Sequence, residues 1–294
     1  MISVIMPAYN EENNIGYAIN DICMQSNQDF ELIIVDDGSE DRTADIVKKH
    51  FSNNRDKIIF LQPGKIGKNA AYNLASKYSK GQWFYFMGAD DRLPSNAFQL
   101  WAEATKKIDP TKKVAIRGRM KVTSINKKYD GLILPKNKKR KNYSGPITLL
   151  SQGMHKLIIP IPEKYPNEDN WWSLCIRYFA EKEYLIDDIV VYYSIHKKNS
   201  VSRDSSYRMF NEKYHKRYVI REDFIDRFHS MLSCSSINEL KSELQCEGFR
   251  YDQEPFKVIL HKNMSLINKI RALFFSNEKL YMIKVYFDRF FLGH

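Results

Sequence analysis

Short apolar runs alternate with helical patterns in the first third of the chain. Residues 2–6, 30–35, 58–61 and 83–87 are almost continuously apolar, as in parallel strands that are covered on both faces. Residues 11–24 and 44–51 have helical spacing, and a further helix is expected to reach Tyr78 from the glycine-marked turn at 64–71. The pattern predicts an α/β fold with a doubly wound, mostly parallel sheet.

The pattern changes in the later part of the chain. We expect a helix at 96–108, one or two strands at 112–125, a turn at 126–131, a helix at 169–181 and a strand at 190–196. From residue 207 onward, helical spacing dominates, at 207–231 and 237–248, and then in two amphipathic pieces between 265 and 292. These patterns predict an α/β domain over residues 1–205 and a helical C-terminal extension over residues 206–294.

The net charge of +11 is concentrated in two segments. Residues 106–142 carry 14 Lys and Arg against 2 Asp and Glu, and residues 257–294 carry 7 against 2. Nucleic acid, anionic lipid and a diphosphate-bearing substrate are all compatible with such patches. The bare basic run at 135–141 is either a solvated loop or a flap that attracts an anionic partner. The aromatic tail at 265–294 either lies on a membrane or packs on protein.

Cysteine usage and hydropathy indicate a cytoplasmic protein. Cys23, Cys175, Cys234 and Cys246 are scattered without metal spacing, which is typical of reduced thiols. The first predicted strand follows Met1 directly, so we expect no signal peptide. No apolar run approaches the ~18 residues of a membrane span. Attachment to the cytoplasmic face of a membrane would therefore be peripheral.

Acidic residues follow two of the predicted strands. Asp36-Asp37-Gly38-Ser39 comes after the second strand, and Gly88-Ala-Asp90-Asp91 after the fourth. Ligands of open α/β sheets bind beyond the carboxyl ends of the strands. A carboxylate pair there suits a hard divalent cation that holds a diphosphate. An isolated Asp-Asp pair can equally be a simple cap for the segment after it.

Four motifs in order resemble the family 2 glycosyltransferases of the GT-A fold, over roughly residues 1–205. They are Pro7-Ala-Tyr9-Asn10-Glu11, Val35-Asp36-Asp37-Gly38-Ser39, Gly88-Ala-Asp90-Asp91, and Asn167-Glu168-Asp169 followed by Arg177. Each motif alone is weak, and their order and separation make the resemblance specific. It implies an inverting transferase of the kind that builds bacterial surface glycans.

The resemblance also implies a donor site. Its nucleotide-binding residues would be Pro7, Tyr9, Glu11, Asp36, Asp37, Lys68 and Asp90. Tyr9 would lie against the base, Asp37 would accept from the base edge, which favours uridine, and Asp90 would reach the ribose. Asp91 and His196 would bind Mn²⁺ or Mg²⁺. Many family members carry a further Asp where this chain has Gly88, which puts more of the metal binding on Asp91.

Asp169 is the catalytic base that the resemblance implies. It would take the proton from the acceptor hydroxyl. Further candidates for contacts with the acceptor or the diphosphate are Glu168, Trp171, Trp172, Arg177, Ser200 and Ser202. The alternative for Glu168-Asp169 is an ordinary acidic helix start, stabilised by the helix dipole. Of the two tryptophans, which could stack on a sugar ring, one is expected in the core.

The sequence therefore predicts a metal-dependent inverting transferase of a hexosyl or N-acetylhexosaminyl group. The donor would be a nucleotide-diphosphate sugar, with UDP favoured, and the acceptor a hydroxyl of a glycan or lipid-linked glycan in surface polysaccharide synthesis. A nucleotidyltransferase is disfavoured because no glycine-rich loop follows the first strand, and a dehydrogenase because GxGxxG is missing. A degenerate glycan- or nucleic-acid-binding module remains the alternative. A nucleic acid partner is not expected for the enzyme, an oligomer is compatible with the sequence, and the sugar is not specified.

Overall fold

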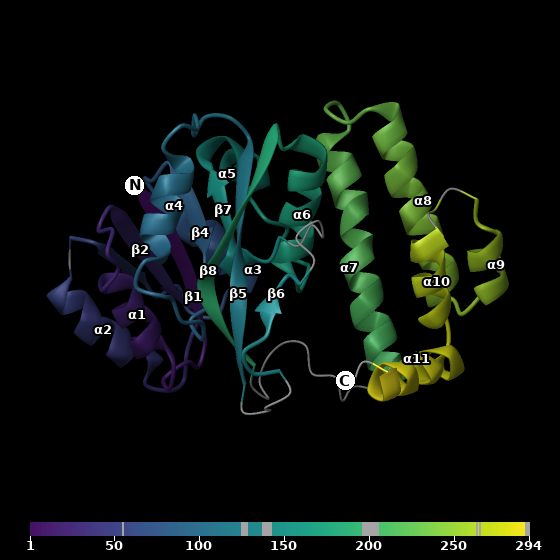
Figure 1. The fold of residues 1–294 in the computed structure, drawn as a ribbon, viewed down its shortest axis with the longest axis horizontal. Helices are drawn as coiled ribbons and strands as arrows, with labels where there is room; N and C mark the ends of the chain where they lie inside the picture. Colours follow the sequence, from purple (N-terminus) through teal and green to yellow (C-terminus); the bar gives the residue numbers. More distant parts are fainter. Residues whose placement is uncertain are drawn as a thin grey trace. The chain divides into compact units, whose positions relative to one another are not determined.

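The computed structural model describes residues 1–54, 56–124, 129–136, 143–195, 206–262, 264 and 266–291. The chain forms two compact units, Met1–Asn199 and Ser200–His294. The first unit contains a mixed sheet with helices on both faces, and the second is helical (Figure 1).

Four parallel strands form the first half of the sheet (Figure 1). They are β1 (Ile2–Ala8), β2 (Phe30–Asp36), β3 (Ile58–Leu61) and β4 (Trp83–Phe86), in the order β3-β2-β1-β4. Ala8 pairs with Asp36, so β1 and β2 end at the same level. The loops that follow these two strands therefore meet at one edge, as the sequence predicts for an open α/β sheet.

Alternate residues of these strands face different helices, as the pleat of a sheet requires. On one face, Val4 and Met6 belong to a core with α1 (Ile15–Cys23), α2 (Thr43–Asn53) and α4 (Ala97–Thr105). On the other face, Phe84 and Phe86 contact His155 and Trp172. Those partners come from α5 (Gln152–Ile158) and α6 (Glu168–Phe179), and α3 (Lys68–Tyr78) lies on the same face.

The second half of the sheet is mixed. It contains β5 (Val114–Ser124), β6 (Ile133–Leu134), β7 (Thr148–Ser151) and β8 (Lys182–Ile195). β7 runs antiparallel to both β4 and β5, whereas β8 pairs parallel with β5. The predicted helices and strands of this unit are present, whereas β6, β7 and α5 were not predicted. β8 begins at Lys182, well before the predicted start at residue 190.

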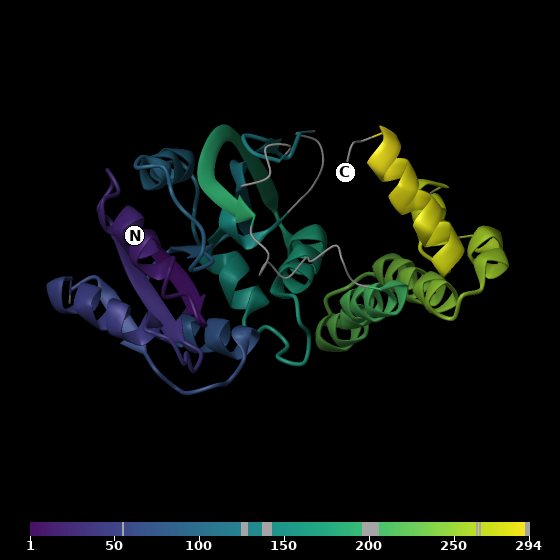
Figure 2. The same ribbon diagram turned by 90° about the horizontal axis from the view of Figure 1, so that it is seen from below.

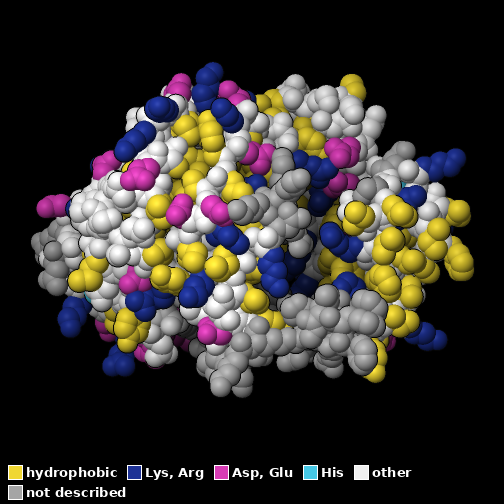
Figure 3. Space-filling model, in the orientation of Figure 1, with side chains coloured by type: hydrophobic (Ala, Val, Ile, Leu, Met, Phe, Trp, Pro, Cys, Tyr) yellow, Lys and Arg dark blue, Asp and Glu magenta, His cyan; other side chains and the backbone are white. Residues whose placement is uncertain are grey.

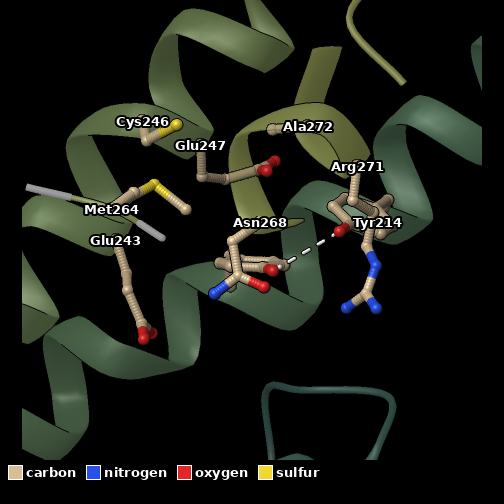
Figure 4. Close-up of a pocket in the computed structure, with 9 residues that line it drawn as sticks. Tyr214, Glu243, Cys246, Glu247, Met264, Asn268, Arg271 and Ala272 are labelled. Atoms are coloured by element: carbon tan, nitrogen blue, oxygen red, sulfur yellow. Dashed lines mark hydrogen bonds between the residues drawn. The ribbon is translucent and has the colours of Figure 1, made fainter. Parts of the chain in front are cut away.

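The second unit consists of helices. α7 (Tyr207–Phe228) and α8 (Cys234–Tyr251) lie side by side, followed by α9 (Pro255–Leu260), α10 (Leu266–Phe274) and α11 (Glu278–Phe291) (Figures 1 and 2). Glu247 of α8 lines a small cavity to which α10 contributes Asn268 and Arg271 (Figure 4). Within the described part of the chain, no helix is both long enough and apolar enough to cross a bilayer.

Candidate active site

Hydrogen bonds join the loop after β1 to the loop after β2. The amide of Asn10 donates to Ser39 Oγ at 3.0 Å, and the amide of Glu11 donates to Thr43 Oγ1 at 2.7 Å. Asn10 has a positive φ of 55°. The predicted helix at 11–24 therefore begins only at Ile15, because the residues before it are held by the neighbouring loop.

Asp36 shapes these loops from inside. The residue is buried, its Oδ1 accepts from the amide of Ser39 at 3.0 Å, and its Oδ2 accepts from Gln62 Nε2 at 3.2 Å. With both oxygens used inside the protein, Asp36 holds the turn after β2 in place. Its predicted contact with the nucleotide stays a prediction.

Asp37 holds the loop at residues 64–67. Its Oδ1 accepts from the amides of Ile66 and Gly67, each at 2.7 Å. A side chain at Gly38, where φ is +73°, would come within 2.8 Å of the amide nitrogen of Lys65. Glycine is thus required at this position both for its backbone conformation and for the close approach of the loop.

Lys65 lies where the base of a nucleotide is predicted. Its Nζ is 3.0 Å from the centroid of the Tyr9 ring and 3.1 Å from Asp37 Oδ2. These are the two groups that the family resemblance assigns to the base. Tyr9 is 43% exposed and Asp37 is buried, so the Lys65 ammonium group contacts one exposed ring and one buried carboxylate.

Four carboxylates gather around Tyr72, a residue of α3 that the sequence did not single out. Burial raises the pKa of the Tyr72 hydroxyl well above its ordinary value, and nearby negative charges raise it further. Those charges belong to Glu168, Asp91, Asp90 and Asp169. The acidic residues after β4 and at the start of α6, far apart in the sequence, therefore meet at one place.

Lys68, the first residue of α3, provides a positive charge at this cluster. Its Nζ lies 2.6 Å from Glu168 Oε1, although its side chain is 55% exposed. Desolvation lowers the pKa of Lys68, but Glu168, with Asp169 and Asp90, shifts it upward overall. The structure pairs Lys68 with an acidic residue of α6, and its position beside the nucleotide stays a prediction.

Asp91 is the residue most suited to a cation. It is 2% exposed, and its Oδ1 has no hydrogen-bond partner among the described residues. Burial raises the pKa of Asp91 well above its usual range, and the Asp90 carboxylate raises it further. A side chain at Gly88 would approach Asp90 Oδ1 to 2.6 Å and Asp91 Oδ2 to 3.1 Å. Gly88 thus leaves space for both carboxylates to fold over the backbone.

A divalent cation fits this donor set with two protein carboxylates. No group of three or more His, Cys, Asp or Glu with the geometry of a metal site occurs within the described ranges. His196, the second predicted ligand, lies outside them, as do Ser200 and Ser202. Magnesium is commonly held by one or two carboxylates together with substrate phosphates. Asp90 and Asp91 could therefore supply the protein ligands, and a diphosphate the others.

Two buried asparagines of α3 position the segment that leads into α6. Asn69 Nδ2 donates to the carbonyls of Pro162 and Tyr165, at 3.0 and 2.8 Å. Asn73 exchanges hydrogen bonds with the backbone of Ile161, at 2.8 and 2.7 Å. α3 therefore fixes the chain just before Glu168 and Asp169. Sequence reasoning missed this role, because a single asparagine on a helix gives no sign of its partner.

The expectation that a tryptophan of α6 stacks on a sugar is wrong. Trp171 is fully buried, and its Nε1 donates to the carbonyl of Ile158 at 2.8 Å. Trp172 is 2% exposed and its ring lies 5.0 Å from that of Phe86. Both rings belong to the core because they lie on the face of α6 that packs on the sheet. Arg177 is exposed on the same helix.

A family model described as glycosyl transferase family 2 matches residues 3–157, more than half of the chain. The chain belongs to this family. WfgD of Escherichia coli, named as a UDP-Glc:alpha-D-GlcNAc-diphosphoundecaprenol beta-1,3-glucosyltransferase, is 34% identical over 100 residues. A dolichyl-phosphate beta-glucosyltransferase of Trichomonas vaginalis is 29% identical over 123 residues. The matches cover 34% and 39% of this chain, and 39% and 38% of those proteins.

Solved structures of other glycosyltransferases share the fold. TarS of S. aureus, in complex with UDP-GlcNAc, has a TM-score of 0.61 at 20% identity, covering 96% of this chain and 83% of that one. The mannosyltransferase PcManGT of Pyrobaculum calidifontis, in complex with GDP-Man and Mn²⁺, has a TM-score of 0.56 at 15% identity, covering 99% and 81%. The predicted GT-A fold, with helices C-terminal to the core, is confirmed.

Proposed function

We propose that this family member is an inverting, metal-dependent glycosyltransferase that uses a UDP-linked sugar. The observation that carries the proposal is that Tyr72 joins two acidic segments. Its ring contacts Phe86 at the end of β4 and Trp172 in α6, and Asp90, Asp91, Glu168 and Asp169 all raise the pKa of its hydroxyl. Keeping several carboxylates close together at a partly buried site costs free energy, which a bound cation or a substrate would offset. Family membership supplies the reaction class.

Asp169 acts as the general base in this proposal. It takes the proton from the acceptor hydroxyl while that oxygen attacks the anomeric carbon, and the bond from this carbon to the diphosphate breaks. The proton stays on Asp169 and the electron pair leaves with the nucleoside diphosphate. Lys68 orients Glu168 beside the base through their ion pair of 2.6 Å.

Asp91, with Asp90 beside it, would hold the divalent cation. When bound, the cation neutralises the charge of the departing diphosphate. The buried, unpartnered Oδ1 of Asp91 supports this role. Mn²⁺ and Mg²⁺ are both compatible, because the described donors are hard oxygen ligands.

The base of the nucleotide lies between Tyr9 and Asp37, where a buried carboxylate can accept from a uracil N–H. The names of two similar proteins, a UDP-Glc transferase and a structure with UDP-GlcNAc, agree with a UDP-linked hexose or N-acetylhexosamine. The name of WfgD includes GlcNAc-diphosphoundecaprenol, a lipid-linked sugar, and this agrees with a lipid-linked glycan acceptor. Such an acceptor lies at a membrane, so peripheral attachment at the cytoplasmic face is part of the proposal.

The test compares donor turnover with metal-dependent binding. The purified chain is incubated with a panel of UDP- and GDP-sugars, with and without Mn²⁺, and hydrolysis of the sugar is measured. We expect one UDP-sugar to be hydrolysed, and only with metal. In calorimetry, Asp91→Ala should lose metal-dependent UDP binding while the circular dichroism spectrum of the fold persists. Unchanged metal-dependent affinity in that variant would refute the metal assignment.

The alternative is a glycan- or nucleic-acid-binding module without catalysis. Gly88 at the start of the Gly88-Ala-Asp90-Asp91 motif, and the 14 Lys and Arg against 2 acidic residues in 106–142, favour it. Such a module would bind glycan or nucleic acid without turning over any nucleotide sugar. The same panel, extended by a binding assay with single-stranded RNA and a surface polysaccharide, separates the two functions.

A further inference from the structure

Exposed apolar side chains gather on the last three helices of the second unit. On α9, α10 and α11, seven large apolar side chains expose more than half of their surface. They are Phe256, Leu260, Leu266, Ile267, Met282, Ile283 and Tyr286. We call these seven residues the apolar face. The space-filling view shows hydrophobic side chains concentrated over this helical part (Figure 3).

The apolar face is additional to the core of these helices. On one side of α10, Ala272 and Leu273 pack with Cys246 and Val258 in a small buried cluster. Leu266 and Ile267, in the first turn of the same helix, are 72% and 70% exposed. A helix that buries one apolar side and exposes another needs a second apolar environment, and contiguous exposed patches of this kind mark interaction sites.

The helices that carry the apolar face are rich in basic residues, although Glu254, just before α9, pairs with Lys257 at 2.7 Å. Residues 255–286 contain six Lys and Arg and one acidic residue. The six are Lys257, Lys262, Lys269, Arg271, Lys279 and Lys284. The partner must therefore be apolar and negatively charged at the same time. An anionic bilayer meets both conditions, since its acyl chains accept the side chains and its headgroups attract lysine and arginine.

We propose that α9, α10 and α11 bind the surface of an anionic membrane, with the apolar face inserted among the headgroups. The helices lie on the bilayer rather than cross it, which agrees with their shortness. This surface serves the proposed function, because a lipid-linked acceptor is presented at a membrane. Membrane binding itself does not depend on the identity of the donor, so the two proposals can fail separately.

The test is co-sedimentation of the full chain with two kinds of vesicle. One contains phosphatidylcholine alone, and the other contains equal amounts of phosphatidylcholine and phosphatidylglycerol. The test variant carries Leu266→Ser and Ile267→Ser, two side chains so exposed that the fold does not need them. The control carries Met24→Ser and Met231→Ser, which removes two exposed apolar side chains, 78% and 52% exposed, elsewhere on the chain.

We expect the parent and the control to bind the anionic vesicles, and the test variant to bind about tenfold or more weakly, since each side chain loses its apolar burial. Binding to phosphatidylcholine alone should be weak, and added salt should weaken binding to the anionic vesicles. Equal binding of the test variant and the control would overturn the proposal. So would a parent that binds no vesicles but sediments as a dimer, with the test variant a monomer, because the apolar face would then join two copies.

UDP binding distinguishes this inference from the proposed function. The test variant should bind UDP as the parent does, because neither substituted residue belongs to the site in the first unit. A parent that binds anionic vesicles through the apolar face but binds no UDP-sugar would refute the proposed function and leave the membrane surface standing.

Discussion

Two clusters of buried charge, one in each unit, differ in how their hydrogen bonds are used. In the helical unit, Arg250 is fully buried and donates to Glu247 at 2.6 and 2.7 Å, to Asn211 Oδ1 at 2.5 Å and to the carbonyl of Phe275 at 3.0 Å. In the sheet unit, Asp91 is equally buried, yet one of its oxygens has no hydrogen-bond partner among the described residues.

This difference distinguishes a charged group that stabilises the fold from a charged group that is suited to bind a ligand. The guanidinium of Arg250 is satisfied by the protein, so it joins α7, α8 and the end of α10 without a ligand. The oxygens Asp91 Oδ1 and Glu168 Oε2 are buried and lack partners in the described part of the chain. An unpaired buried acceptor costs free energy, and a substrate or cation can recover it. Substitutions in the two clusters should therefore affect different properties.

The largest expected effect is on catalysis, from Asp169→Asn. The amide keeps the shape of the side chain but cannot accept the proton, and loss of a positioned base typically costs ~10²–10⁴ in rate. We expect UDP-sugar and metal to bind as in the parent, with transfer to acceptor reduced by that order. Single-turnover assays with a known acceptor provide the measurement.

Glu168→Gln is the matched control, because Glu168 is assigned to orientation and should lose less activity. Near-parental transfer by Asp169→Asn together with an inactive Glu168→Gln would move the base by one residue. Activity in both variants would leave only a helix start at this position, and the proposed mechanism would be wrong.

The next largest effect is on stability, from Arg250→Met. Removal of the guanidinium leaves the buried carboxylate of Glu247 without its strongest partner and with His215 Nδ1, at 3.1 Å, as the remaining one among the described residues. Breaking a buried ion pair in this way costs about 3–5 kcal/mol. We expect thermal denaturation to show early melting of the helical unit, and calorimetry to show UDP binding that persists at lower temperature. Replacing both partners, Arg250→Met with Glu247→Met, should recover part of the loss. If Arg250→Met changed UDP affinity without changing the melting curve, the comparison between the two clusters would fail.

A smaller effect follows from a buried group of the sheet unit that carries no charge. His155 stacks on Phe84 at 3.6 Å between ring centroids, and its Nε2 lies 3.1 Å from Ser76 Oγ. Burial lowers the pKa of His155 from 6.5 to about 3. Between about pH 3 and pH 6.5, the His155 side chain therefore binds a proton more readily in the unfolded chain than in the folded protein. The stability of the sheet unit is fully present above pH 6.5 and should fall by roughly 1.4 kcal/mol per pH unit below it.

Urea denaturation at pH 7, 6 and 5 measures this dependence. His155→Gln removes the titrating group, so its stability should fall less over the same range than that of the parent. Parallel pH dependence in the two proteins would show that other groups control the acid stability.

The smallest predicted effect concerns Lys65. Its contact with the Tyr9 ring, worth about 0.5–1 kcal/mol, must be given up when a base enters the slot. Lys65→Ala should therefore bind uridine roughly two- to fivefold more tightly in calorimetry. Lys77→Ala, an exposed change on α3, is the control. Weaker uridine binding by Lys65→Ala would show instead that Lys65 contributes to binding the nucleotide base.

The strands and helices of the first half were predictable because their apolar runs are local signals. β7, with only the sequence Thr-Leu-Leu-Ser, is too short for such a signal. The early part of β8 contains Glu183, Asp187 and Asp188 and pairs with β5 alone, so it lacks the apolar run of a central strand.

The candidate site was predictable as a set of motifs but not as a set of contacts. Asp91 and Glu168 could be selected from their motifs. The pairing of Lys68 with Glu168 spans 100 positions in the sequence and appears only in three dimensions. Tyr72 and Asn73 were missed for the same reason. The glycines on both sides of Lys65 were the one local sign that this turn has a special conformation.

The first turn of α3 has a consequence for the order in which substrates bind. The amide of Gly67, just before the helix, donates to Asp37. Lys68 donates to Glu168, and Asn69 donates to the carbonyl of Tyr165. The backbone of residues 67–69 thus connects Asp37, which would contact the nucleotide base, to the segment that carries the catalytic base Asp169. We expect a nucleotide that displaces Lys65 from Asp37 to shift this stretch, and with it the segment before Asp169. We expect compulsory-order kinetics, with donor first and acceptor second.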